Sequence, residues 1–160
     1  MSLRVCVDAS LALKLVLDEE DSDRAHALWQ AWVSADTEIV APEYLAVEAT
    51  SVIRNHVYRG LLSKEAGQAA FDALHAQAIT LISSQGLNSR AWELSEQFGR
   101  PTAYDAYYMV VAETFGCDLW TADRRFVKAV RDTVSWVKWL GDEPHPGDKK
   151  LGLDNRTKAK

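Results

Sequence analysis

The chain has 160 residues, of which 48% are hydrophobic and 26% charged, and its formal net charge is −5. This composition is typical of one globular domain with a substantial core, and it excludes a disordered chain. The negative charge argues against a broad cationic surface for nucleic acid, although local basic patches and bound metal ions could still screen phosphate.

Short apolar runs alternate with helical patterns along the chain. Strands are predicted at 3–7, 38–41, 78–83, 118–122 and 135–139. Helices are predicted at 10–17, 22–34, 43–59, 63–77, 87–98 and 103–115, and a last one starts near Asp123. The alternation predicts the α/β class, with a central parallel five-stranded sheet and helices on both faces. The domain is predicted over 1–140, with a flexible C-terminal tail over 141–160, where Pro, Gly, Asp and Lys dominate.

The sequence predicts a soluble, cytoplasmic protein that does not enter a membrane. It has no apolar run of about 18 residues and no charged-then-apolar leader. Cys6 and Cys117 both lie in apolar surroundings and are interpreted as small core residues. No C-x-x-C or H-x-x-x-H spacing occurs, which argues against a zinc site.

Two acidic residues follow predicted strands. Asp8 comes directly after VCV, and Asp123 follows the strand that contains LWT. Ligands of an open parallel α/β sheet bind outside the carboxyl ends of its strands, so both acids are expected at the functional edge. The alternative is that each acid only caps the helix that follows it.

Two further acids lie within apolar helix faces. Glu48 is four residues after Tyr44, and Asp105 is four residues before Met109. A carboxylate in such a position is costly unless it is paired or bound to a metal. The alternatives are that Glu48 pairs with a core-facing Arg or Lys, and that Asp105 belongs to a capping box that starts at Thr102.

Four converging carboxylates would bind a hard divalent cation. Carboxylate oxygens suit Mg²⁺ or Mn²⁺, whereas softer metals prefer the His and Cys clusters that are missing here. Without metal, the like charges would raise one another's pKa values. With one or two ions, the site could hold a phosphodiester and activate a water for in-line attack.

Four blocks of the sequence resemble the PIN domain, and most closely the VapC-type toxins of bacterial and archaeal toxin–antitoxin pairs. The blocks are VDASLALKLVLDEE at 7–20, APEYLAVEATSVI at 41–53, YDAYYMVVAE at 104–113 and LWTADRRF at 119–126. Their order and spacing agree with the family over about residues 4–140. The resemblance implies a three-layer α/β/α sandwich and a Mg²⁺- or Mn²⁺-dependent endoribonuclease.

The resemblance also implies which residues form the site. The catalytic and metal-binding quartet falls on four acids: Asp8, Glu48, Asp105 and Asp123. Ser10 and Thr121 match hydroxyl positions that support the site by hydrogen bonds. Many relatives have an asparagine three residues after the glutamate, and this chain has Ser51 there, which puts a minor polar contact in doubt but not the metal site.

The family further implies an RNA substrate, a homodimer, and a cognate antitoxin whose C-terminal segment covers the active groove. That segment often places a basic residue among the acids. The helices at 11–34, with Leu13, Val16, Trp29 and Trp32, are predicted as partner surface. The alternative for the two tryptophans is ordinary core packing.

Several basic residues are candidates for contacts with RNA phosphates. Arg124 and Arg125 stand beside Asp123, and Lys14 lies within the first of the four blocks. The wider set adds three more cations: Arg54, Arg100 and Lys128. The alternative for all of them is a solvated helix face.

Two other functions fit parts of the pattern. A non-catalytic PIN-like module that binds RNA or protein would keep the fold, although intact acids argue against it. Another Mg²⁺-dependent phosphoryl-transfer domain would also place an aspartate after a strand. Phosphatases with a D-x-D signature need an acid where this chain has Ser10, and the residues of a receiver domain are not evident.

Overall fold

In a computed structural model of the chain, which describes residues 3–148, five strands form one parallel sheet. The strands are β1 (Arg4–Val7), β2 (Glu38–Pro42), β3 (Ile79–Ile82), β4 (Asp118–Thr121) and β5 (Val137–Trp139). Their order is β3-β2-β1-β4-β5, and every neighbouring pair is parallel. The predicted class and the five-stranded parallel sheet are therefore confirmed.

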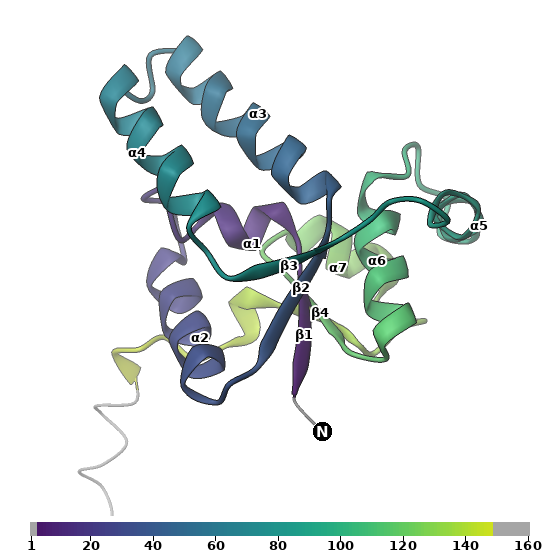
Figure 1. Cartoon of the computed structure of the whole chain (residues 1–160). Helices are drawn as coiled ribbons and strands as arrows, with labels where there is room; N and C mark the ends of the chain where they lie inside the picture. The colour runs from purple at the N-terminus through teal and green to yellow at the C-terminus, as the bar shows by residue number, and fades with distance from the viewer. Residues whose placement is uncertain (1–2, 149–160) are drawn as a thin grey trace, which may run out of the picture.

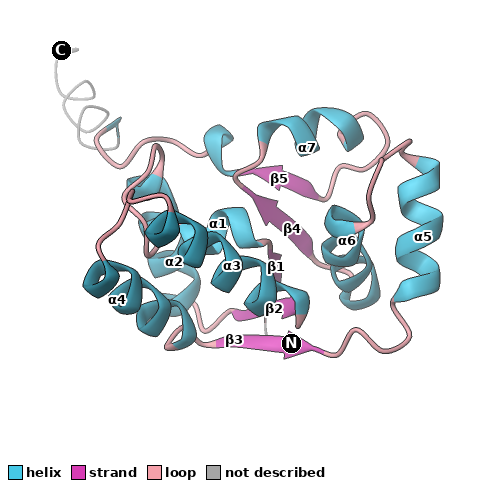
Figure 2. Ribbon diagram, turned by 90° about the horizontal axis from the view of Figure 1, so that it is seen from above, coloured by secondary structure: helices cyan, strands magenta, loops and turns pink. Residues whose placement is uncertain are grey.

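Helices cover both faces of this sheet. They are α1 (Ala9–Leu13), α2 (Ser22–Ser34), α3 (Tyr44–Tyr58), α4 (Lys64–His75), α5 (Asn88–Gln97), α6 (Tyr104–Phe115) and α7 (Arg124–Val130). Figures 1 and 2 show α1 to α4 on one side of the sheet, and α5 and α6 on the other. Helix α6 packs on β1, β2 and β4, and α7 packs on β5. The arrangement is the predicted three-layer α/β/α sandwich.

Local signals set most helix ends close to where the sequence predicts them, although α1 ends at Leu13 and not near residue 17. The hydroxyl of Ser63 accepts the backbone N–H of Ala66 at 3.0 Å and starts α4. Helix α6 ends at Gly116, whose φ of +60° is a left-handed conformation that glycine adopts without steric cost. These caps satisfy backbone groups that a helix end leaves without partners.

The strand order creates a switch point at the centre of the sheet. From β1 the chain winds outward through β2 to β3, and it then returns to place β4 on the other side of β1. Val7 of β1 is in register with Trp120 of β4. In open α/β sheets, ligands bind in the crevice where the winding direction reverses. The carboxyl ends of β1 and β4 therefore mark the expected site.

Trp29 and Trp32 belong to the core, which confirms the alternative of ordinary core packing for both. Trp29 and Trp32 are each only 8% exposed, and their ring centroids lie 5.9 Å apart. Trp32 also meets Trp120 of β4 edge-on at 5.8 Å. Leu13 is buried as well, so the partner-surface prediction is wrong for these three side chains. A helix that covers a sheet must bury its largest apolar side chains against it.

The chain after β5 continues into a short 3-10 turn, Leu140–Asp142, which packs against α2. The predicted tail over 141–160 thus begins within the described residues, but 149–160 lie outside them, and its flexibility stays a prediction. None of the helices within 3–148 combines the length and apolar character that crossing a bilayer requires.

Candidate metal-binding active site

Asp8 lies buried at the carboxyl end of β1 and caps α1. Its Oδ1 accepts hydrogen bonds from the Ser10 hydroxyl at 2.7 Å and from the Leu11 N–H at 3.0 Å. Its Oδ2 accepts the hydroxyl of Thr121. Burial raises the pKa of Asp8 to about 7, the hydrogen bonds oppose that change, and the charge of Glu48 adds to it. Asp8 is thus both a helix cap and a buried acid that needs a cationic partner when ionised.

Two hydroxyls join the ends of β1 and β4. Besides their bonds to Asp8, Ser10 accepts the N–H of Ala122 and Thr121 accepts the N–H of Asp123, each at 3.0 Å. Each hydroxyl therefore donates its proton to Asp8 and accepts a backbone N–H from the loop after β4. Both hydroxyls hold the Asp8 carboxylate by hydrogen bonds, and their supporting role in a metal site stays a prediction.

Asp123 follows β4 and begins α7. Its Oδ1 accepts the N–H groups of Arg125 at 2.8 Å and Phe126 at 3.1 Å, so the capping interpretation is correct for this residue. Its Oδ2 accepts no hydrogen bond from any residue within 3–148. Capping uses only one oxygen, and the other remains available to a ligand.

Glu48 lies half-buried on α3. Its Oε2 accepts the hydroxyl of Tyr108 at 2.8 Å. It forms no ion pair with an Arg or Lys of the described chain, so the predicted alternative of a core ion pair is wrong. Burial raises the pKa of Glu48, the bond from Tyr108 lowers it, and the charge of Asp105 raises it again.

Asp105 lies in the first turn of α6 without capping it. The N-cap residue is Ala103, which has no side-chain capping bond, so the capping-box alternative is wrong. Instead, Oδ2 of Asp105 pairs with the guanidinium of Arg100 at 2.9 Å. Burial raises the pKa of Asp105, the pair with Arg100 opposes this, and the charge of Asp123 raises it further.

The four acids share one electrostatic neighbourhood. The charge of Glu48 raises the pKa of Asp8, the charge of Asp105 raises that of Glu48, and the charge of Asp123 raises that of Asp105. Two strand ends and two helices thus bring together acids that are up to 115 positions apart in the sequence numbering. Such mutual repulsion is what a divalent cation relieves.

The donor chemistry of the site fits a hard divalent cation. Glu48, Asp105 and Asp123 each keep one oxygen that accepts no hydrogen bond from the described chain. As these side chains stand, however, no three His, Cys, Asp or Glu residues within 3–148 surround one point closely enough to hold an ion. Arg100 holds Asp105 and Tyr108 holds Glu48 by hydrogen bonds.

Sequence reasoning did not predict the partners of two acids. Tyr108 follows Asp105 by three residues on α6, and this spacing indicates only an apolar neighbour of that acid. Arg100 was considered for RNA phosphates, not for a pair with Asp105. The spacing of Tyr108 places it on the same helix face as Asp105, but only the packing of α6 against α3 shows that its hydroxyl meets Glu48.

The predicted RNA contacts differ in their surroundings. The guanidinium of Arg124 stacks on Trp139 at 5.1 Å from the ring centroid. Lys14 is 15% exposed at its side chain and pairs with Glu19 at 3.3 Å. Arg125 is exposed and forms no ion pair within the described chain. The RNA-binding role of the three residues stays a prediction.

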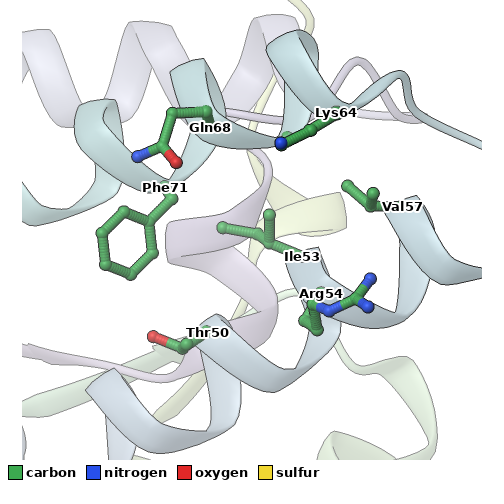
Figure 3. A pocket seen from close by; sticks show the side chains of 8 residues that line it. Thr50, Ile53, Arg54, Val57, Lys64, Gln68 and Phe71 are labelled. Carbon is green, nitrogen blue, oxygen red and sulfur yellow. The ribbon is translucent and has the colours of Figure 1, made fainter.

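A separate cavity of about 500 Å³ opens between α3 and α4 (Figure 3). Ile53, Val57 and Phe71 give it apolar walls, and Arg54 and Lys64 add two cations. None of the four acids lines it. This cavity is therefore separate from the acidic site, where the pKa values of Asp8, Glu48 and Asp105 are raised.

Comparisons with known proteins match most of the chain to one domain family. The family model described as "PIN domain" matches residues 5–132. The VapC ribonuclease Mb0985 of Mycobacterium bovis is 31% identical over 121 residues, which cover 76% of this chain and 87% of the relative. Ribonuclease VapC3 of Pyrobaculum aerophilum is 29% identical over 128 residues, which cover 79% of this chain and 94% of the relative.

Two solved structures share the fold. PAE2754 of Pyrobaculum aerophilum superposes with a TM-score of 0.58 at 21% identity, covering 79% of each chain. VapC20 of Mycobacterium tuberculosis, described as a sarcin-ricin loop cleaving toxin, superposes with a TM-score of 0.60 at 18% identity, covering 79% of this chain and 95% of the other. At these identities the likeness concerns the fold alone.

Proposed function

The chain belongs to the PIN domain family, and from this premise we propose that it is a metal-dependent endoribonuclease that acts as the toxin of a toxin–antitoxin pair. The observation that carries the proposal is the electrostatic coupling of four acids at the carboxyl edge of the sheet. Relatives at 29–31% identity that bear the name ribonuclease support the same activity.

Asp8, Glu48, Asp105 and Asp123 would hold one or two Mg²⁺ or Mn²⁺ ions. A bound ion of this kind supplies Lewis acidity toward a phosphodiester oxygen and positive charge against the polyanion. The free oxygens of Glu48, Asp105 and Asp123 support this assignment, because no residue within 3–148 donates a hydrogen bond to them.

The chain's own residues prepare this site. Ser10 and Thr121 orient Asp8 by donating to both of its oxygens, which keeps the buried carboxylate in one rotamer. Tyr108 orients Glu48 in the same way. Preorganised ligands lower the cost of assembling a charged site at the moment of reaction.

Arg100 has a different role in this proposal. It neutralises Asp105 while no cation is bound, because its guanidinium lies 2.9 Å from a carboxylate oxygen. A divalent ion at Asp105 would displace this pair and free the guanidinium for an RNA phosphate. The exposed Arg125 and the stacked Arg124 would add further phosphate contacts beside Asp123.

An antitoxin and a second copy of the chain are the proposed protein partners, meeting in the cytoplasm. The antitoxin would inhibit by covering the acidic edge and contributing a cation to it. Co-purification with the product of a neighbouring small gene would test the first partner. Analytical ultracentrifugation of the isolated protein would test the homodimer.

The activity is tested with purified protein, Mn²⁺ or Mg²⁺, and a panel of structured and single-stranded RNAs. We expect cleavage by the wild type, loss of cleavage in Asp105→Asn, and loss in the presence of EDTA. Equal cleavage by wild type and Asp105→Asn would remove the assignment of the site. Calorimetric titration distinguishes the nuclease from the alternative of a non-catalytic module. The nuclease should bind Mg²⁺ or Mn²⁺, and the non-catalytic module should bind neither ion.

A further inference from the structure

Two tyrosine rings stack at the starts of α3 and α6. Tyr44 is the first residue of α3 and Tyr104 the first of α6. Their ring centroids are 5.5 Å apart, and their planes differ by only 6°. Tyr44 also packs against Tyr107 at 6.3 Å, and the hydroxyl of Tyr107 donates to Asn88 at 2.7 Å. The stack is therefore anchored to three helices.

This stack adjoins the acidic site. Tyr44 lies one helical turn before Glu48 on the same face of α3, and Tyr104 directly precedes Asp105. Burial raises the pKa of Tyr44, and the charges of Glu48 and Asp105 raise it further. The carboxylates are thus near enough for their field to reach the ring.

The outer face of Tyr104 is open to solvent. The residue is 55% exposed, although Tyr44 covers one face of its ring. A residue this exposed, with Tyr44 stacked on one side of its ring, leaves aromatic surface that a ligand can reach. Among the described residues, the hydroxyls of Tyr107 and Tyr108 donate hydrogen bonds to side chains, but that of Tyr104 does not. What Tyr104 offers to a ligand is a flat aromatic surface.

We propose that the outer face of Tyr104 stacks on an unpaired nucleobase next to the phosphodiester that the acids hold. This inference rests on the proposed ribonuclease function and adds Tyr104 to its site as a base-stacking residue. Every base has a face that stacks on an aromatic ring, so the contact tolerates sequence. A base inside an A-form duplex is already stacked and cannot reach such a ring.

The negative net charge of the protein makes a stacking contact important for RNA affinity. With a net charge of −5, the chain has no overall attraction for a polyanion. Affinity must then come from the site itself, from metal ions and from contacts that do not depend on charge. Stacking is such a contact, and it persists at salt concentrations that screen phosphate contacts.

The first experiment measures kcat/KM on a single-stranded RNA with Mn²⁺. Tyr104→Leu should lower kcat/KM by about 5- to 100-fold, the loss expected for one stacked base. Tyr104→Phe keeps the ring and should restore cleavage to within about two-fold of the wild type. Tyr58→Ala is the matched control, because Tyr58 is 79% exposed at the opposite end of α3.

An RNA that lacks one base beside the scissile bond tests directly whether Tyr104 stacks on that base. If Tyr104 stacks on that base, its removal and Tyr104→Leu should not multiply in their effects on kcat/KM. If base removal and Tyr104→Leu multiplied in their effects on kcat/KM at both positions that flank the scissile bond, the inference would be overturned. Equal cleavage of RNA by the wild type and Tyr104→Leu would overturn it too. Circular dichroism of each variant separates these results from unfolding.

A binding readout keeps the inference testable if the wild type cleaves nothing. RNA with 2-aminopurine in place of a base, mixed with the protein and Mg²⁺, should show quenched fluorescence that Tyr104→Leu abolishes and Tyr104→Phe retains. Quenching without cleavage would refute the proposed function and leave the stacking correct. Absence of quenching at every labelled position would refute the stacking.

The same exposed ring could instead belong to a contact between copies of this chain. Size-exclusion chromatography of wild type and Tyr104→Leu without RNA measures this directly. A dimer that dissociates on Tyr104→Leu, together with unchanged RNA quenching, would assign the ring to a protein interface and overturn the inference. Unchanged elution with lost quenching supports it.

Discussion

Thr121 donates its hydroxyl to the buried carboxylate of Asp8, and this hydrogen bond joins two residues that are 113 positions apart. It connects the ends of two strands that lie side by side only because the chain reverses its winding direction between β3 and β4. The candidate site is built around this connection. Four predictions follow its contacts outward.

Thr121→Val should destabilise the protein by about 1–3 kcal/mol, because Oδ2 of Asp8 loses its hydrogen-bond donor. The side-chain volume at position 121 stays nearly the same. Urea denaturation measures the change. Thr114→Val is the matched control, since its exposed hydroxyl only donates to the carbonyl of Val110 within α6. An equal loss for both variants would contradict the special role of Thr121.

The metal-free protein should lose stability as the pH rises from about 4 to 7. Burial raises the pKa of Asp8 from 3.8 to about 7. Below both pKa values, the Asp8 carboxyl is protonated in the folded and the unfolded state. Its ionisation then does not change the free energy of unfolding. Between the two pKa values the unfolded chain releases its proton first, so unfolding becomes easier, by up to about 4 kcal/mol over the full difference.

Urea titrations in EDTA across this pH range measure the effect. Asp8→Asn should flatten most of the profile, and the raised pKa values of Glu48 and Asp105 account for a remaining slope of the same sign. Mn²⁺ should restore stability at the upper end, because it favours the ionised acids. If the free energy of unfolding increased from pH 4 to pH 7, the prediction would be wrong. Asp8 would then not be a buried acid that lacks a cation in the metal-free protein.

Tyr108→Phe should lower kcat for RNA cleavage by about ten-fold, because Glu48 loses the donor that orients it and the pKa of Glu48 rises further. A cleavage assay with Mn²⁺ provides the measurement. Tyr107→Phe is the control on the adjacent residue, since its hydroxyl donates to Asn88 and not to an acid. Full activity in Tyr108→Phe would show that Glu48 needs no such positioning.

Arg100→Gln should tighten Mn²⁺ binding by about three- to ten-fold, since it removes a positive charge that competes for Asp105. Isothermal titration calorimetry measures the dissociation constant. Arg90→Gln is the matched control, because Arg90 forms an ion pair of similar length with Glu113, at 2.7 Å, outside the acidic site. Weaker binding in Arg100→Gln would mean that the guanidinium orients Asp105 instead of competing for it.

The sequence predicted the layers of this fold because they depend on local patterns. Apolar runs with β-branched residues indicated the five strands, and helical spacing between them indicated parallel pairing. Helix ends followed from residues such as Ser63 and Gly116, whose caps need no distant partner. Asp8 and Asp123 could be located at one edge of the sheet, because all strands of a parallel sheet point the same way.

The sequence could not predict which face of one element meets which face of another. Glu48 and Asp105 were expected to point inward, but only the packing of α3 and α6 gave Glu48 the hydroxyl of Tyr108 and left Asp105 to Arg100. The same limit applies to Trp29 and Trp32, which helical spacing marks as apolar without saying what covers them.

The sequence by itself thus determined the type of sheet and the residue types of the candidate site, since periodicity and residue type are local properties. The tertiary structure decided the strand order, the partners of each acid and the stack of Tyr44 on Tyr104. These depend on long-range packing, in which the free energy of burying whole faces selects one arrangement among several that the local pattern allows.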